Sequence, residues 1–248
     1  RLFQRWRLCG PWCGALLFAL HPVNAGTVSY IFCRSDLLAT SFTLGALLLW
    51  LARGRWMRVA YPLSLLAFAL ALLSKQSAIV LPVLVLCLEY LLAGAAWREA
   101  VRAGKWRHLG LWALAGVYLL WRGAYFGGIG DMEANATWPY AAYLCIQPYA
   151  VLRYLEFLVA PVGLCIDHCL AYPQSSWEPH IILSLLALVV LALLTHWAVR
   201  KKPLPSRFTL FALLWMLATL GPTASFFPTT SALVENRLYL SSVALALL

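Results

Sequence analysis

The sequence alternates between long apolar runs and short basic clusters. The runs approach the roughly 20 residues that an α-helix needs to cross the hydrocarbon core of a bilayer. They lie at about residues 8–20, 27–52, 59–73, 79–97, 109–126, 141–160, 181–199 and 208–220. Since 63% of the residues are hydrophobic and only 11% are charged, the composition excludes a water-soluble domain. We therefore predict an all-α, polytopic transmembrane helix bundle that forms a single multispanning membrane domain over residues 1–248.

The basic clusters predict the topology of this bundle. Fourteen of the nineteen Lys and Arg residues fall in four short segments, at residues 1–7, 53–58, 98–107 and 200–207. Segments rich in Lys and Arg favour the cytoplasmic side of a membrane, so we expect the alternating connectors on the outer side. These outer connectors are residues 21–36, 74–77, 127–180 and 221–237.

One apolar run does not fit this alternation. Three runs lie between residues 107 and 200, whereas two crossings return the chain to the same side. The middle run is the least apolar, because it contains Gln147, Pro148, Arg153 and Glu156. We therefore expect residues 140–160 to form a re-entrant or interfacial helix on the outer face.

The remaining five cations are assigned to the outer side, where Lys and Arg are usually scarce. They are Arg34, Lys75, Arg122, Arg153 and Arg237. A phosphate headgroup is the anion most abundant at a bilayer surface, so this group is a candidate for phosphate binding. The alternative for each cation is an interfacial anchor or an ion-pair partner.

Three of these five cations lie in polar motifs. The first contains His21, Asn24, Arg34 and Asp36, and ionisable groups there cost roughly 2.5–3.5 kcal/mol each in a bilayer unless they line a wet site. A proline follows His21 and predicts a helix end at that position, and Ser35 or Asp36 suits a helix N-cap. Lys75 lies in a tight polar hairpin, the second motif.

The third polar motif follows the run at 208–220 and precedes a further, short apolar segment at residues 238–248. It brings Glu235 and Arg237 to the start of a new helix. The alternative for this motif is a local ion pair at the membrane interface.

The cysteines and the net charge suggest no further chemistry. The seven cysteines are scattered mostly within apolar runs and show no disulfide framework. Cys165 and Cys169 flank Asp167 and His168 and are able to pair or to hold a metal, but we interpret this spacing as incidental and expect no metal site. The net charge of +10 is explained by cytoplasmic connectors, so we expect no nucleic-acid partner.

Four segments carry a family resemblance. They are ALHPVNAGTVSYIFCRSDLLAT at 19–40, ALLSKQSAIVLPVLVL at 71–86, YLEFLVAPVGLCIDH at 154–168 and ENRLYLSSVAL at 235–245. In order and spacing they resemble the membrane domain of the transmembrane and tetratricopeptide-repeat O-mannosyltransferases and their bacterial relatives, within the GT-C glycosyltransferases. The resemblance implies a GT-C-like fold and a transferase that takes a sugar, with mannose expected, from a polyprenyl-phosphate or dolichyl-phosphate donor to a protein Ser or Thr hydroxyl.

The resemblance also assigns partners and a location. The partners would be the lipid bilayer, the lipid-linked sugar donor and a protein acceptor, and no cofactor is expected beyond the donor itself. The reaction would take place on the periplasmic or lumenal face. We expect an integral protein of the bacterial inner membrane, with the endoplasmic reticulum membrane as the alternative.

The polar motifs then acquire expected roles in this reaction. The donor phosphate would be bound by Arg34, Lys75 and Arg237, while donor or acceptor would be positioned by His21, Asn24, Asp36, Asp167 and His168. The family's acidic motif has no counterpart in residues 1–248, so we expect the catalytic base N-terminal to Arg1, with Asp36 and Glu235 as weaker candidates. We also expect any tetratricopeptide repeats beyond Leu248.

The sequence departs from the family at two points and leaves two other functions open. HPVN lacks the second histidine of the animal members, and Gln76 replaces a glutamate in the usual SKE. An oligosaccharide ligase acting on lipid-linked glycans would use the same groups. A non-enzymatic transporter or scaffold is the other alternative, but a transporter usually shows internal repeats and ionisable residues near mid-bilayer.

Overall fold

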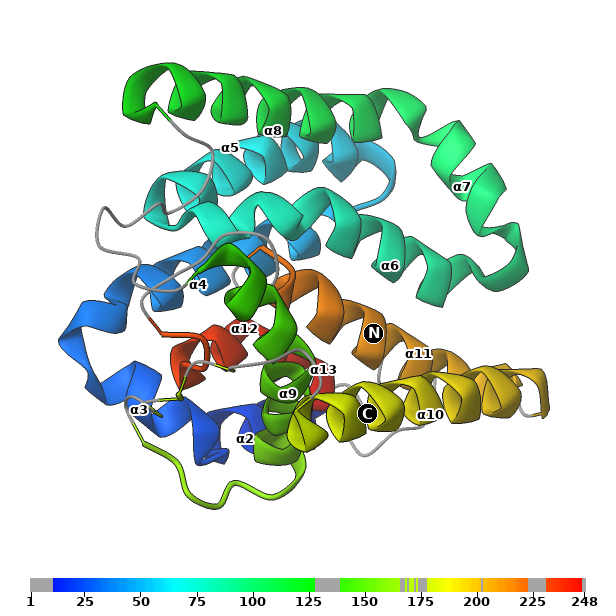
Figure 1. Cartoon of the computed structure of the whole chain (residues 1–248). Coiled ribbons are helices and arrows are strands. Elements are labelled where there is room, and N and C mark those ends of the chain that lie inside the picture. Colours follow the sequence, from blue (N-terminus) through cyan, green and yellow to red (C-terminus); the bar gives the residue numbers. More distant parts are fainter. Residues whose placement is uncertain are drawn as a thin grey trace. The chain divides into compact units, whose positions relative to one another are not determined.

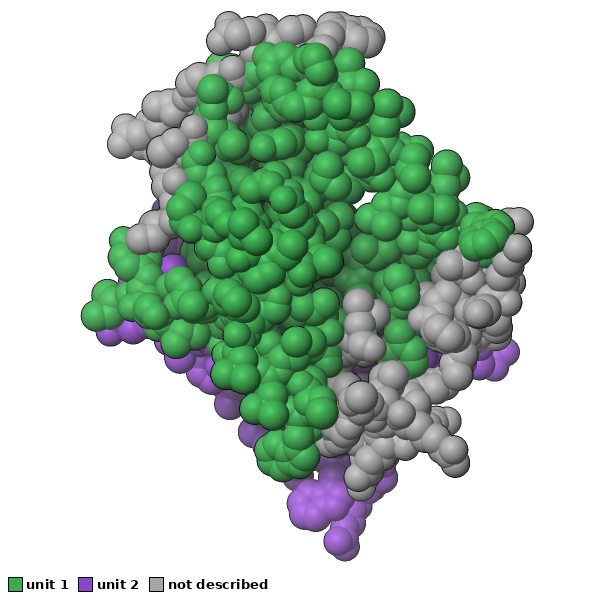
Figure 2. Space-filling model, turned by 90° about the horizontal axis from the view of Figure 1, so that it is seen from below, with its two compact units in different colours: residues 1–31, 132–248 green, residues 32–131 purple. Residues whose placement is uncertain are grey.

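The structure is a computed structural model that describes residues 11–127, 139–165, 168, 170, 171, 173, 178–201, 203–222 and 231–246. Within these ranges every regular element is a helix, which confirms the all-α prediction. The chain divides into two compact units, residues 32–131 and residues 1–31 with 132–248, which Figure 2 distinguishes by colour. The single membrane domain expected over residues 1–248 stays a prediction.

The unit of residues 32–131 is a bundle of long helices joined by short turns (Figure 1). Its α-helices are α4 (Arg34–Trp50), α5 (Met57–Ser74), α6 (Leu81–Ala93), α7 (Trp97–Ala103) and α8 (Lys105–Phe126), with 3-10 turns η2 (Gly54–Trp56), η3 (Gln76–Val80) and η4 (Gly94–Ala96). Helix α5 packs along α4 and also touches α8. Gly54 and Gly94 adopt φ values of 64° and 62°, a region that favours glycine, and each begins a turn between two helices.

The other unit combines both ends of the described chain. It contains α2 (Pro11–Leu20), α3 (Val23–Ser29), α9 (Tyr140–Val159), α10 (Pro179–Lys201), α11 (Pro203–Leu220), η5 (Glu235–Arg237), α12 (Leu238–Ser241) and α13 (Val243–Ala246). The 3-10 turn η1 (Ile31–Cys33) lies at the boundary between the two units. Helix α9 contacts α10, and α12 contacts both α3 and α11.

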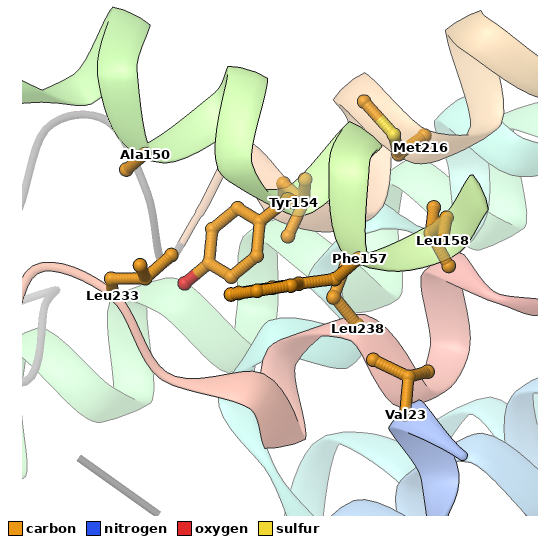
Figure 3. Close-up of a cluster of buried hydrophobic side chains, with 9 residues drawn as sticks. Val23, Ala150, Tyr154, Phe157, Leu158, Met216, Leu233 and Leu238 are labelled. Carbon is orange, nitrogen blue, oxygen red and sulfur yellow. The ribbon is translucent and has the colours of Figure 1, made fainter. Parts of the chain in front are cut away.

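The core of this unit lies under one face of α9 (Figure 3). Tyr154 and Phe157 are fully buried and three positions apart, so their rings project from the same side of the helix. They pack with Val23 of α3, Met216 of α11 and Leu238 of α12. Burying an aromatic side chain of this size contributes roughly 1.5–3 kcal/mol, so these contacts hold four helices together.

Four of the described helical segments are long and apolar enough to cross a membrane, which agrees with the polytopic prediction. They are Ile31–Trp50, Gly54–Ser74, Gln76–Ala93 and Pro179–Trp197. Helix α10 leaves Leu183, Leu186, Val190, Leu193 and Trp197 more than half exposed, as expected for a helix that faces lipid. The chain is therefore an integral membrane protein.

Helices α8, α9 and α11 lie in predicted apolar runs but do not belong to these four candidate spans. Helix α9 is not among the candidate spans, and both its expected failure to cross and its place at the outer face stay predictions. Helix α8 is not among them either, so its expected crossing also stays a prediction. Helix α11 contributes a shorter apolar segment, Phe208–Leu220.

The first polar motif differs from the expected connector, because most of it is helical. Helix α3 buries Val23, Asn24 and Thr27, which share one face, so two of its polar side chains point into the protein. The N-cap of α4 is Cys33, and Asp36 lies in the first helical turn; the expected N-cap role of Asp36 is therefore wrong. A carboxylate in a first turn is still favoured by the helix dipole.

Candidate functional site

Asp36 and Lys75 form an ion pair in the unit of residues 32–131. Lys75 is the one residue between α5 and η3, and its extended backbone directs the chain from one helix into the next. Its Nζ donates to Oδ1 of Asp36 at 2.6 Å. The two side chains are 23% and 11% exposed, for Lys75 and Asp36 respectively, so the pair is partly shielded from water. The structure thus joins two of the predicted motifs, which lie 39 positions apart.

This pair changes how Lys75 can act on an anion. An ammonium group has three N–H donors, and one of them points at Asp36. The carboxylate fixes the Lys75 side chain and also balances its charge. Arg34 is exposed at the first position of α4, two residues before Asp36.

His21 and Asn24 make contacts within the unit of residues 1–31 and 132–248. The Nε2 of His21 lies 3.1 Å from the carbonyl of Leu158, and Val23 N–H donates to His21 Nδ1 at 3.3 Å. These contacts assign the ring proton to Nε2. Asn24 is buried, donates from Nδ2 to the carbonyl of Phe18 at 2.7 Å, and accepts from the hydroxyl of Ser242 at 3.0 Å.

These contacts give His21 and Asn24 structural roles. Their polar atoms form hydrogen bonds with groups of the protein that would otherwise lack a partner in an apolar interior. Their predicted role in positioning donor or acceptor stays a prediction.

Glu235 meets His168 and Cys165 in the same unit. Oε1 of Glu235 lies 3.1 Å from His168 Nε2 and accepts the backbone N–H of Cys165 at 2.6 Å. On the other side of the ring, His168 Nδ1 lies 3.3 Å from Cys165 Sγ. The imidazole also stacks on Phe157, with ring centroids 5.1 Å apart. The sequence pointed to each of these residues but not to their meeting, because the loop after α9 and the start of η5 are far apart in the chain.

Arg237 supports the backbone that leads into η5. Its two terminal nitrogens donate to the carbonyls of Ser231 at 3.0 Å and Ala232 at 3.3 Å. Nearby, the hydroxyl of Tyr154 donates to the carbonyl of Val234 at 3.2 Å and accepts its N–H at 3.0 Å. Burial raises the pKa of Tyr154, although the positive charge of Arg237 acts in the opposite direction.

The predicted site residues therefore fall into two groups. Arg34, Asp36 and Lys75 belong to one unit, and His21, Asn24, His168, Glu235 and Arg237 belong to the other. The convergence of the three cations on one phosphate stays a prediction for that reason. Asp167 lies outside the described residues, as does Cys169.

A buried polar cluster in residues 32–131 was missed by the sequence analysis. Glu89 is 9% exposed, accepts the indole N–H of Trp50 at 3.1 Å, and lies 3.0 Å from His108 Nε2. The Arg107 guanidinium lies 4.1 Å from the centroid of the Trp50 ring and donates to the Trp50 carbonyl at 2.7 Å. The sequence did carry a signal, because Glu89 is an acid within an apolar run.

This cluster lies at helix ends. Trp50 is the last residue of α4, and His108 lies in the first turn of α8. Polar groups at helix ends can pair with backbone that the helices leave unsatisfied, as Arg107 does with Trp50. The cluster therefore indicates a structural contact between helices. Its place at helix ends differs from the mid-bilayer ionisable groups expected of a transporter.

Comparisons with known proteins give one informative similarity. Over 244 residues the chain is 25% identical to a protein O-mannosyl-transferase of Caenorhabditis elegans. The similarity covers 94% of this chain but 33% of the worm protein, so the chain spans about a third of the length of that relative. No family model and no solved structure matches the chain.

Proposed function

We propose that this chain is the membrane-embedded part of a glycosyltransferase that moves mannose from a polyprenyl-phosphate donor to a Ser or Thr hydroxyl of a protein. The observation that carries the proposal is the similarity to an O-mannosyl-transferase along 94% of the chain. The apolar candidate spans fit a substrate that is itself a membrane lipid. We place the reaction on the outer face, periplasmic or lumenal, where the connectors carry few basic residues.

The chemistry assigns a function to the Asp36–Lys75 pair. Sugar transfer from a lipid phosphate needs a carboxylate to accept the proton of the attacking hydroxyl and a cation to stabilise the departing phosphate. Lys75 supplies a partly exposed ammonium held in place by Asp36. We propose that Lys75 contacts the donor phosphate, with Arg34 as a second cation from the start of α4.

The two candidate bases have different surroundings. Asp36 contacts Lys75, while Oε1 of Glu235 receives the Cys165 N–H and lies beside His168. A base needs a free lone pair directed at the substrate. Asp36 has the stronger link to the proposed phosphate ligand, so we rank it above Glu235 among the described acids.

Binding of dolichyl-phosphate mannose to the detergent-solubilised protein tests this proposal. A charge-assisted contact to phosphate contributes about 1.5–3 kcal/mol, so Lys75→Ala should weaken donor binding about 10- to 100-fold. Lys75→Arg should retain most of the binding, because it keeps the charge. Loss of mannose transfer to a Ser/Thr peptide should accompany the loss of binding.

Lys105→Ala is the matched control. Lys105 is an exposed lysine of the same unit, beside Trp106, and it belongs to a basic cluster assigned to the cytoplasmic side. The Lys105→Ala variant should bind the donor with the same affinity as the unmodified protein. Equal loss in both variants, or none in either, would refute the role of Lys75; binding of the lipid without any transfer to an acceptor peptide would favour a carrier function.

A further inference from the structure

Three metal-ligating side chains from two distant segments meet beside η5. Cys165 and His168 come from the loop after α9, and Glu235 is the first residue of η5. One ligand atom from each residue lies within 4.8 Å of the other two. The contacts join positions 67 and 70 residues apart in the chain, so folding itself assembles the group.

The three ligand atoms lie within 4.8 Å of one another, somewhat wider than in a coordinated zinc site. With Zn–S bonds of about 2.3 Å and Zn–N or Zn–O bonds of about 2.0–2.2 Å, neighbouring ligands in a tetrahedral site lie about 3.3–3.6 Å apart. In the structure, Cys165 Sγ lies 3.3 Å from one nitrogen of His168, and Glu235 Oε1 lies 3.1 Å from the other. These two contacts involve the two nitrogens on opposite sides of the ring, and one ion would use a single nitrogen. The ligand on the other side would therefore have to approach by about 1 Å to reach the separation of a zinc site.

The site is both constrained and reachable. The His168 and Glu235 side chains are only 10% and 12% exposed, and the His168 ring stacks on the buried Phe157. Cys165 is exposed, which leaves a path for an ion to enter. Gly163, with φ of 71°, adopts a conformation that other residues rarely take and turns the chain just before Cys165.

We propose that Cys165, His168 and Glu235 form a Zn²⁺ site. A thiolate, an imidazole and a carboxylate suit zinc, whereas Mg²⁺ and Ca²⁺ prefer oxygen ligands alone. Binding releases the Cys165 thiol proton to solvent and leaves a fourth position for water or a ligand. The ion would link the loop after α9 to the segment that enters α12, and it would make Glu235 a ligand instead of a catalytic base.

Metal titration of the purified protein tests the site independently of sugar transfer. After dialysis against a chelator, the protein should bind about one Zn²⁺ per chain, and excess Mg²⁺ should not displace it. Co²⁺ in the same site should give a thiolate-to-metal charge-transfer absorption band. Loss of a group that merely supports a ligand costs 10- to 100-fold in affinity, so Cys165→Ser, His168→Asn and Glu235→Gln should each cost at least about 100-fold.

Cys13→Ser and His180→Asn are the matched controls. Cys13 is an exposed thiol in α2, and His180 is a well-exposed histidine in α10 of the same unit. Both variants should keep the cobalt band and the zinc affinity. Circular dichroism identifies any variant that fails to fold. If Cys165→Ser does not fold, the zinc affinity of Glu235→Gln still tests the proposed site. Unchanged zinc affinity in folded His168→Asn and Glu235→Gln proteins, or no saturable binding at all, would overturn the proposal.

Discussion

The Asp36–Lys75 pair allows a quantitative test of the structure. Asp36→Asn keeps the shape of the side chain and removes its charge, while Lys75→Met keeps most of the aliphatic stem. Fully exposed ion pairs contribute about 0–1 kcal/mol, and breaking a fully buried pair costs about 3–5 kcal/mol. With side-chain exposures of 11% and 23%, this pair lies between those limits. We expect a coupling energy of about 1.5 kcal/mol.

The assay is a double-mutant cycle on the detergent-solubilised protein. The free energy of unfolding is measured for the unmodified protein, each single variant and the double variant. Each single variant should be less stable by about 1–2 kcal/mol, and the double variant should lose less than the sum of the two. Because the pair is partly buried, the coupling should change little when ionic strength rises from low to physiological values.

A coupling energy below about 0.5 kcal/mol would refute this reasoning, because distant and independent positions add to within that margin. Ser41→Ala is a suitable control in the same helix. Its hydroxyl donates only to the carbonyl of Leu37, one turn earlier, and it is exposed. A cycle that combines Ser41→Ala with Lys75→Met should give a coupling energy near zero. A clear coupling energy in this control would mean that the cycles report a general loosening of the unit and not the ion pair.

Three further predictions concern buried contacts. Glu89→Ala should lower the free energy of unfolding by about 3 kcal/mol, because it leaves buried N–H groups without an acceptor, whereas the exposed Glu99→Ala should change it by less than about 0.5 kcal/mol. Tyr154→Phe should cost about 1–3 kcal/mol in urea unfolding, since two backbone groups lose their partner. Burial raises the pKa of Tyr154, so above about pH 10 the unfolded chain loses its proton first and stability falls; this decline should be smaller in Tyr154→Phe. Gly110→Ala would place a Cβ in the space of the Tyr61 hydroxyl and should lower the free energy of unfolding by about 1–3 kcal/mol. Adding Tyr61→Phe should restore part of this loss. Equal stability of Gly110→Ala and the unmodified protein would contradict the packing.

Much of the helical framework could be predicted from the sequence. Apolar runs of the right length identify candidate spans directly, and the break at Lys75 follows from a polar segment between two such runs. The helical character of α3 could not be predicted in the same way. Its polar side chain Asn24 faces inward because Ser242 provides a partner, and this partner lies 218 positions away.

The candidate site was predictable as a set of residues but not as a geometry. Charge and position pointed to Asp36, Lys75 and Glu235, since ionisable groups in an apolar chain are costly without a use. Their partners depend on how distant segments pack, which no local pattern encodes. His168 shows this clearly: the spacing of Cys165 and Cys169 around it is interpreted as incidental, and only the approach of Glu235 gives Cys165, His168 and Glu235 a common chemistry.

The discontinuous make-up of one unit affects how the protein is built in the cell. Residues 32–131 form a contiguous unit, so its helices can pack as soon as they leave the translocation machinery. Helices α2 and α3 are synthesised earlier but must wait, because His21 needs Leu158 and Asn24 needs Ser242. The Nδ2 group of Asn24 can already donate to Phe18, but until Ser242 emerges the Oδ1 atom of Asn24 lacks the donor that it has in the folded unit. The packing of α2 and α3 therefore depends on segments that are synthesised more than 130 residues later, so we expect a nascent chain that stops before Ser242 to leave this unit incompletely packed.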